Sequence, residues 1–261
     1  MLRKEIDLLG YRLHATDGEL GMLQEHVFDK DAWTVRYLLV KTGPWLDNRD
    51  VFISPIALGS IDEERKCIQV KLKQGQVAGS PHVNIHKPVS RRYEVAYYNY
   101  YGWPVYWGAG GRWGNELYAK ELFDVAPFVE APGSHEEQER TTNLMNTGGI
   151  KGYRVFARDN RIGTVEDFIM NDESWAIRYL VVNGTGLKAP RQVVLSPLWF
   201  SDLSQAERMM TLDFSIKDIE SSPQYDPTRV MHRGDELALF QHYGRGKEID
   251  AIFVGMREPA L

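Results

Sequence analysis

The sequence predicts a mainly β protein: two tandem small antiparallel β-barrels, each followed by a short helix. Residues 10–102 repeat as residues 152–244 without an insertion or deletion, and every aligned pair lies 142 positions apart. Hydrophobic side chains alternate with period two inside each copy, which is typical of strands, and each copy ends on helical spacing. We therefore expect repeat one at 1–102, a connector at 103–151, repeat two at 152–244 and a C-terminal cap or tail at 245–261.

The residues that both copies share are mostly turn formers and large aromatic residues, which fix a backbone. This repeat signature consists of Gly10, Tyr11, Asp17, Gly21, Trp33, Arg36, Tyr37 and Pro55 in copy one and of Gly152, Tyr153, Asp159, Gly163, Trp175, Arg178, Tyr179 and Pro197 in copy two. Such residues have structural reasons to recur. The duplication therefore indicates an architecture and does not by itself indicate a reaction.

Turn residues define the first strands of each copy. Asp17-Gly18 in copy one and Asp159-Asn160 in copy two tolerate positive φ, so residues 10–15 and 19–28 are expected to form a hairpin. The strand that follows, at 33–41, has two faces that are both largely apolar. Such a strand fits a small barrel whose outer surface is partly covered.

Shorter strands and a helix complete each copy. Residues 51–54 predict a strand that ends at a proline, which has no N–H to continue a ladder, and a last strand is expected at 68–72. Ser90 then caps a helix that ends at Gly102. The apolar side of this helix is expected to pack on its own barrel. Copy two repeats the order, so each copy has five or six short strands.

The connector changes character along its length. Its first part is rich in aromatic residues and glycine, and residues 131–149 are polar with proline and glycine, as in a flexible linker. Copy two is followed by a different pattern. Helical spacing there predicts a short helix that docks as a cap, with apolar positions at Ile249, Ile252, Phe253 and Met256.

Both copies contain one set of motifs in register: Gly-Tyr-x-Val/Leu, an Asp-Gly-type turn, a glycine with Val or Leu two positions later, and Trp-x-Ile/Val-Arg-Tyr-Leu-x-Val ahead of Ser-Pro. This set resembles the PRC-barrel family. That family includes the cytoplasmic domain of the photosynthetic reaction centre H subunit and a domain of the ribosome maturation factor RimM. The resemblance covers both copies and the Tyr-Tyr-Gly-Trp-Pro-x-Tyr-Trp run at 100–107, and so nearly the whole chain.

The resemblance implies a strongly bent antiparallel sheet that closes into a barrel and serves as a docking surface. In the H subunit the barrel packs on membrane subunits and assists proton delivery to a quinone, and in RimM it engages a ribosomal protein. The H subunit's membrane anchor and RimM's N-terminal domain are not recognised in this sequence. We therefore expect a non-enzymatic interaction or scaffolding protein, one version of which is peripheral to a membrane electron-transfer complex. RimM-like RNA or ribosome association, and a small-ligand binder or undescribed enzyme, are the alternatives.

Composition restricts the partners. The chain has 261 residues, 26% of them charged, and a net charge of -5, which disfavours nucleic acid as a partner. A single cysteine excludes an internal disulfide, and Cys67 faces Met209 in the repeat, as a small core hydrophobe would. No stretch is long and apolar enough to cross a membrane. The expected location is the cytoplasm, including the cytoplasmic face of a membrane.

The sequence predicts no catalytic residue, cofactor site or metal site. His82 and His86 are spaced as H-x-x-x-H but flank a proline-containing turn, which favours two solvated histidines over a metal site. The glycine run at 108–114 lacks the ending of a phosphate-binding loop. Asp17 and Arg36 recur at the equivalent positions of copy two. We expect each aspartate to cap a turn and each arginine to be held by a carboxylate or by carbonyl groups, and we favour these structural roles over a functional site in the barrel mouth.

The largest asymmetry between the copies is aromatic. Eight aromatic residues fall within 17 residues of copy one and its connector, and nothing comparable follows Gly244. Aromatic residues are frequent anchors of protein interfaces. The predicted partner or self-association contacts are Tyr97, Tyr98, Tyr101, Trp103, Tyr106, Trp107 and Trp113. A junction between the barrels, or a homodimer, is favoured over a foreign partner.

Overall fold

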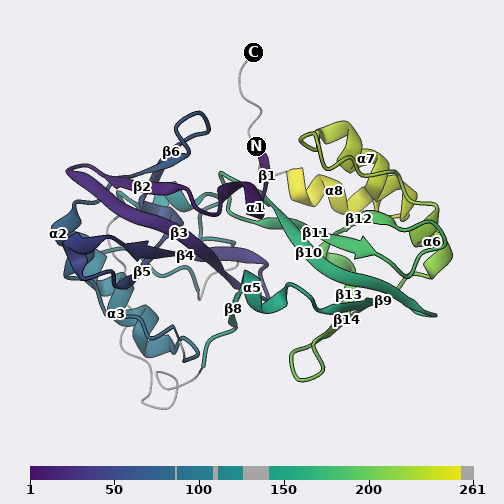
Figure 1. The fold of residues 1–261 in the computed structure, drawn as a ribbon, viewed down its shortest axis with the longest axis horizontal. Helices are drawn as coiled ribbons and strands as arrows, with labels where there is room; N and C mark the ends of the chain where they lie inside the picture. Colours follow the sequence, from purple (N-terminus) through teal and green to yellow (C-terminus); the bar gives the residue numbers. More distant parts are fainter. Residues whose placement is uncertain (86, 108–110, 126–140, 254–261) are drawn as a thin grey trace. The chain divides into compact units, whose positions relative to one another are not determined.

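A computed structural model describes residues 1–85, 87–107, 111–125 and 141–253. The protein is mainly β, with two seven-stranded sheets and short helices (Figure 1). Contacts divide it into two compact units. The first-repeat unit comprises Glu5–Gly149 and Asn171–Ala176, and the second-repeat unit comprises Met1–Lys4, Ile150–Met170 and Ile177–Leu261.

The sheet of the first-repeat unit has the order β5-β4-β3-β2-β7-β6, with β8 paired to β3. The strands are β2 (Arg12–Ala15), β3 (Gly18–Asp29), β4 (Thr34–Thr42), β5 (Asp50–Ile53), β6 (Leu58–Asp62), β7 (Cys67–Val70) and β8 (Leu144–Asn146). The pair β2 and β7 is parallel, whereas the other pairs are antiparallel. The predicted hairpin is confirmed, because β2 and β3 are antiparallel neighbours joined by the Asp17 turn.

Short helices cover this sheet. They are α1 (Glu5–Leu8), η1 (Pro44–Leu46), η2 (Pro55–Ala57), α2 (Gln74–Ala78), α3 (Arg91–Tyr101) and η3 (Ala119–Leu122). Both predicted ends of α3 are confirmed: the Ser90 hydroxyl accepts from the Tyr93 N–H at 3.2 Å, and Gly102 adopts φ of 69°. The helix packs on its own sheet, since the Tyr97 hydroxyl donates to the Phe52 carbonyl on β5 at 3.0 Å.

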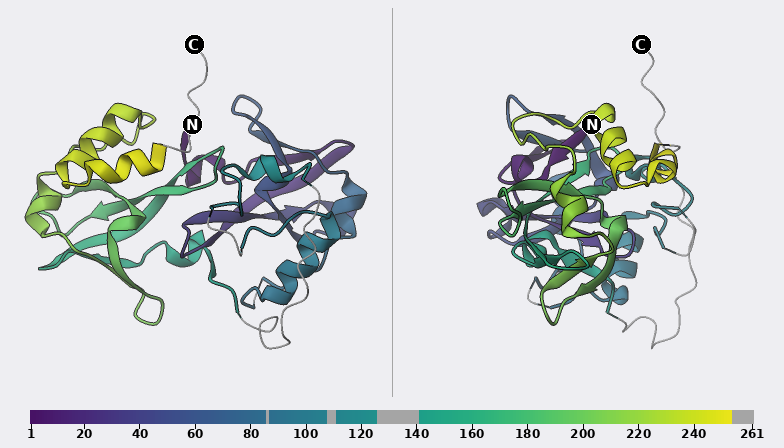
Figure 2. Two further views of the ribbon diagram at one scale, coloured as in Figure 1. Left: turned by 180° about the vertical axis from the view of Figure 1, so that it is seen from behind. Right: turned by 90° about the vertical axis from the view of Figure 1, so that its right-hand side faces the viewer.

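The second-repeat unit repeats this plan with the order β12-β11-β10-β9-β14-β13 and with β1 paired to β10. Its strands are β1 (Leu2–Lys4), β9 (Arg154–Phe156), β10 (Arg161–Asn171), β11 (Ile177–Gly184), β12 (Arg191–Leu195), β13 (Phe200–Ser204) and β14 (Met209–Leu212). The helices are η4 (Pro197–Trp199), α6 (Ile216–Glu220), α7 (Arg233–His242) and α8 (Gly246–Phe253). Helix α5 (Thr147–Ile150) has its first three residues in the first-repeat unit and Ile150 in the second. Figure 2 shows α7 and α8 side by side, and Ile249 of α8 is buried. Ile252 and Phe253 lie in α8, whereas Met256 lies outside the described residues.

Closure of the sheets is not seen. The edge strands are β5 and β6 in one unit and β12 and β13 in the other. Among the described residues, neither pair of edges is joined by a ladder of hydrogen bonds, as a fully closed barrel requires. Two mainly antiparallel sheets are therefore the finding, and closure into barrels stays a prediction.

The seventh strand of each sheet comes from the chain segment that precedes the other repeat. Strand β1 precedes repeat one but pairs with β10 of repeat two, and β8 precedes repeat two but pairs with β3 of repeat one. The first residues of β1 and β8, Leu2 and Leu144, are 142 positions apart, so the duplication begins ahead of residue 10. The compact units consequently differ from the predicted segments, which follow the repeat.

Trp33 and Trp175 differ from prediction. Both were expected to begin a strand, but they lie in the turns ahead of β4 and β11, with φ of 46° and 59°. The carboxylate of Asp29 closes the first turn by accepting from the Asp31 N–H at 2.9 Å and from the Ala32 N–H at 3.3 Å. This side-chain turn ends β3 and delays the start of β4. The predicted burial of both faces of β4 is confirmed.

Replacing Gly21 with alanine is expected to destabilise the first-repeat unit by about 2–4 kcal/mol. Gly21 has φ of 148°, and a Cβ there would overlap with the Lys41 carbonyl oxygen of the neighbouring strand. The matched control is Gly75→Ala in α2, where a Cβ would meet no atom within 4 Å. Urea unfolding followed by circular dichroism compares the two variants. Equal midpoints for Gly21→Ala and Gly75→Ala would contradict the prediction.

Candidate functional site

A buried carboxylate on α3 gathers three donors in the first-repeat unit. Glu94 is fully buried. Its Oε1 accepts from the Tyr37 hydroxyl at 3.0 Å and from the Tyr106 hydroxyl at 2.8 Å, and Arg91 Nη1 lies 2.6 Å from its Oε2. Strand β4, helix α3 and the connector therefore meet at one side chain, in what we call the Glu94 network.

Arg36 extends the Glu94 network along β4. This arginine is 2% exposed, and its Nη1 donates to the Arg112 carbonyl at 2.6 Å. Its guanidinium lies 3.7 Å from the centre of the Tyr106 ring and 4.7 Å from that of Trp113, distances typical of cation–π contacts. The Asp29 carboxylate lies 3.6 Å away. The connector thus supplies most of the groups around this charge.

Burial has the largest effect on the pKa values of the ionisable groups in this network. It raises the pKa of Glu94, whereas Arg91 and the two tyrosine hydroxyls act in the opposite direction. Burial, with the nearby Glu94 carboxylate, also raises the pKa of Tyr37 and Tyr106 well above the ordinary tyrosine value. Both hydroxyls consequently stay protonated at neutral pH and act as hydrogen-bond donors.

In the second-repeat unit the equivalent tyrosine and glutamate also form a hydrogen bond, and there the arginine contacts the glutamate directly. Arg178 Nη2 lies 2.9 Å from Glu236 Oε1, and the Tyr179 hydroxyl donates to the same oxygen at 2.7 Å. These residues are the equivalents of Arg36, Glu94 and Tyr37 at the 142-residue offset. Residues 245–261, which follow repeat two, contain a single aromatic residue, Phe253. The Tyr–Glu hydrogen bond is therefore part of the repeat, and in copy one the connector adds Tyr106 to the same carboxylate oxygen.

The predicted contact residues lie mostly inside the first-repeat unit. Tyr97, Tyr98, Trp103, Tyr106 and Trp113 are buried, and Tyr101 and Trp107 are partly exposed. Trp113 Nε1 donates to the Ser174 carbonyl at 2.8 Å. The connector aromatics therefore contribute to the core of this unit, and little of their surface is available to a partner.

The remaining signature residues have structural contacts. Asp17 was expected to cap its own turn, but its Oδ1 accepts from the Gln74 N–H at the start of α2, at 2.8 Å. Asp159 does the same for Ile216 at the start of α6, also at 2.8 Å. The carboxylates therefore cap helices. The two arginines are held as expected, Arg36 chiefly by a carbonyl group and Arg178 by a carboxylate.

A second buried polar cluster joins residues that are far apart in the sequence. His26 Nδ1 lies 3.3 Å from Glu5 Oε1, and the Thr147 hydroxyl donates to that same oxygen. Glu5 and Thr147 occupy equivalent positions, 142 residues apart. The neighbouring Glu25 accepts from the Gly148 N–H at 2.8 Å, and burial raises its pKa. This cluster therefore joins the segment ahead of repeat one, at Glu5, to the segment ahead of repeat two, at Thr147, within the first-repeat unit.

The other residues considered for chemistry have ordinary surroundings. Arg49 Nη1 lies 2.9 Å from His82 Nε2, whereas His86 and residues 108–110 lie outside the described residues. Cys67 is buried on β7. Among the residues that the structure describes, no group of three or more His, Cys, Asp or Glu could hold a metal ion. None of the helices described is long and apolar enough to cross a membrane.

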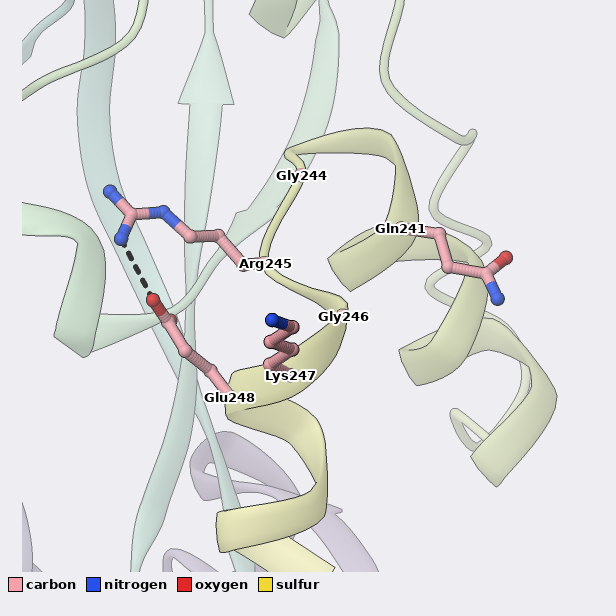
Figure 3. A pocket seen from close by; sticks show the side chains of 6 residues that line it. All are labelled: Gln241, Gly244, Arg245, Gly246, Lys247 and Glu248. Atoms are coloured by element: carbon pink, nitrogen blue, oxygen red, sulfur yellow. Dashed lines mark hydrogen bonds and ion pairs between the residues drawn. The ribbon is translucent and has the colours of Figure 1, made fainter.

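A wide hollow lies where α7 meets α8 (Figure 3). Its volume is about 750 Å³, and it is lined by Gln241, Gly244, Arg245, Gly246, Lys247 and Glu248. Arg245 Nη1 lies 2.8 Å from Glu248 Oε1, so these two lining residues form an ion pair with each other.

Comparison with known proteins adds no assignment: no family model matches the chain, and no curated protein matches it. Function must therefore be inferred from the geometry of the two repeats. The helix expected between Ser90 and Gly102 contains Glu94, and the equivalent helix contains Glu236, but their networks were not identified from the sequence. The two glutamates occupy equivalent positions of the repeat, and so do Arg36 and Tyr37 with their copy-two counterparts. This joint recurrence was the available signal, because residues that recur together can be partners in space.

Proposed function

We propose that this chain is a non-enzymatic protein-interaction scaffold built from two PRC-barrel-type repeats. One observation carries the proposal: repeat one holds a separate, peptide-like segment, the connector, through side chains of its own sheet and helix. Trp107 lies 4.0 Å from the Arg91 guanidinium and packs edge-on against Tyr98 at 5.5 Å. Tyr106 donates to Glu94. Aromatic anchors that pack on an arginine and bond to a buried glutamate are typical of protein interfaces.

The repeats differ in a way that suits a scaffold. Both contain the Tyr–Glu hydrogen bond and the helix that carries its glutamate, and in copy one the aromatic connector adds Tyr106 to that glutamate. Copy two is thus the repeat that we expect to bind a partner. By analogy with the H subunit, we propose a protein complex at the cytoplasmic face of a membrane as the setting.

The test is purification of the tagged full-length chain from native lysate with the membrane fraction retained, followed by size-exclusion chromatography with light scattering. We expect a complex of defined stoichiometry that survives moderate salt. Recovery of the chain alone and monomeric would overturn the proposal. Salt-sensitive co-sedimentation with ribosomal subunits would also overturn it, in favour of a role in RNA binding.

A further inference from the structure

One apolar position is buried in repeat one and exposed in repeat two. Ile56 of η2 is 0% exposed, whereas its equivalent, Leu198 of η4, is 63% exposed. Two residues further on, Leu58 is buried and its equivalent Phe200 is half-buried. We call Leu198 and Phe200 the Leu198 face. The two copies share their local fold here, since Ser54 and Ser196 both cap the short helix.

The connector explains the burial of Ile56. Helix η3 packs against η2, and its Ala119 and Leu122 side chains are 1% and 4% exposed. The next residue, Phe123, has its ring centre 4.7 Å from Lys71 Nζ. A single helical turn with a small residue and a leucine three positions apart is therefore what covers this surface in copy one.

The connector also brings a tryptophan, Trp103, to copy one, and copy two has a tryptophan of its own in the corresponding contact. In copy one, Trp103 stacks on Tyr101 with ring centres 4.5 Å apart. In copy two, Trp199 lies 4.6 Å from Tyr243, the equivalent of Tyr101. Trp199 replaces Ala57 and is itself buried. Among the described residues, no helical turn packs against η4 as η3 packs against η2.

We propose that the Leu198 face binds a segment of a partner protein that forms one helical turn with a small residue and a leucine three positions apart. This inference rests on the proposed interaction function and names its surface. The expected partner segment resembles helix η3, because η3 covers the equivalent surface in copy one. Burial of a leucine side chain on each side supplies the affinity.

The charge next to the face refines the expected partner. Asp213 replaces Lys71, and its carboxylate lies 2.8 Å from Arg158 Nη2. The contact that Phe123 makes with an ammonium group therefore has no equivalent in copy two. The leucine should matter for binding to the Leu198 face, and an aromatic residue directly after it should not.

The probe is a fluorescent peptide with the sequence of residues 115–125, titrated into the full-length chain and followed by anisotropy. We expect saturable binding that Leu198→Asp weakens by about tenfold or more. Met22→Asp is the matched control, because Met22 is also exposed, at 48%, but lies on the other unit. A peptide with Leu122→Asp should not bind, and one with Phe123→Ala should bind as well as the parent.

Three results would overturn the inference: no binding at millimolar protein, equal binding to Leu198→Asp and wild type, or equal weakening by Met22→Asp. Because Leu198 is exposed, its substitution should leave the circular dichroism spectrum and melting temperature unchanged. The native complex separates this inference from the proposed function. If that complex forms equally well with Leu198→Asp, the Leu198 face is wrong and the scaffold stands, whereas absence of any complex overturns the scaffold.

Discussion

Raising the pH above 10 is expected to unfold the first-repeat unit before the second-repeat unit. Burial raises the pKa of six tyrosines in the first-repeat unit: Tyr37, Tyr93, Tyr97, Tyr98, Tyr101 and Tyr106. In the second-repeat unit, burial raises the pKa of Tyr179, and that of Tyr243 to about 12. The first-repeat unit therefore holds many more phenol protons that unfolding would release.

Proton linkage sets the direction of this effect. A tyrosine whose pKa is higher in the folded than in the unfolded state contributes stability that is complete below the unfolded value, near 10, and is lost as the pH rises toward the folded value. Each such group loses about 1.4 kcal/mol per pH unit in that window. At about pH 11 the loss is roughly 8 kcal/mol for six tyrosines and roughly 3 kcal/mol for two. The larger loss is comparable to the whole stability of a typical domain.

Tryptophan fluorescence can separate the two units. Six of the seven tryptophans lie in the first-repeat unit, and Trp199 lies in the second. Alkaline titration should give an early fluorescence transition that coincides with a step in tyrosinate absorbance, and a later transition in circular dichroism. The Trp199→Phe variant should keep the early fluorescence transition. Tyrosine ionisation near pH 10 without unfolding, or simultaneous unfolding of both units, would contradict the prediction.

The local elements of this fold could be predicted because short-range patterns determine them. Ser90 and Gly102 mark the ends of α3, and the Asp17 turn joins β2 to β3. Strand β6 was not assigned, since Leu58–Asp62 carries a glycine and polar residues and shows no clear alternation. Propensity and turn chemistry act over a few residues, so they identify elements of this kind most reliably.

The exchange of β1 and β8 could not be predicted from the sequence. Each strand has three residues, and each pairs with a strand more than 100 positions away in the sequence. The burial of the connector was also ambiguous, because aromatic residues are enriched both in cores and at interfaces. What distinguishes the two cases here is Glu94, a buried acceptor that requires donors, two of which are Tyr37 and Tyr106.

Replacing Glu94 with alanine is expected to destabilise the first-repeat unit by about 3–5 kcal/mol. The change removes the shared acceptor of Tyr37, Tyr106 and Arg91, and so leaves buried donors without a partner. Because Tyr106 belongs to the connector, Trp107 and Trp113 should become more exposed, with red-shifted tryptophan emission. Urea unfolding followed by fluorescence measures both effects.

Two variants test whether the network, and not mere packing, is responsible. Glu236→Ala removes the equivalent acceptor from a unit without an aromatic connector, so the loss of stability should lie in the second-repeat unit and leave the emission of the first nearly unchanged.

Glu94→Gln keeps one acceptor oxygen and is expected to cost less than alanine. Since burial raises the pKa of Glu94, the native state binds its proton more readily than the unfolded chain. Its contribution to stability is therefore largest below the unfolded pKa and is lost as the pH rises through the folded pKa. Glutamine cannot ionise and should flatten that dependence. An unchanged pH profile in Glu94→Gln, or a Glu94→Ala variant as stable as wild type, would show that the carboxylate does not organise this unit.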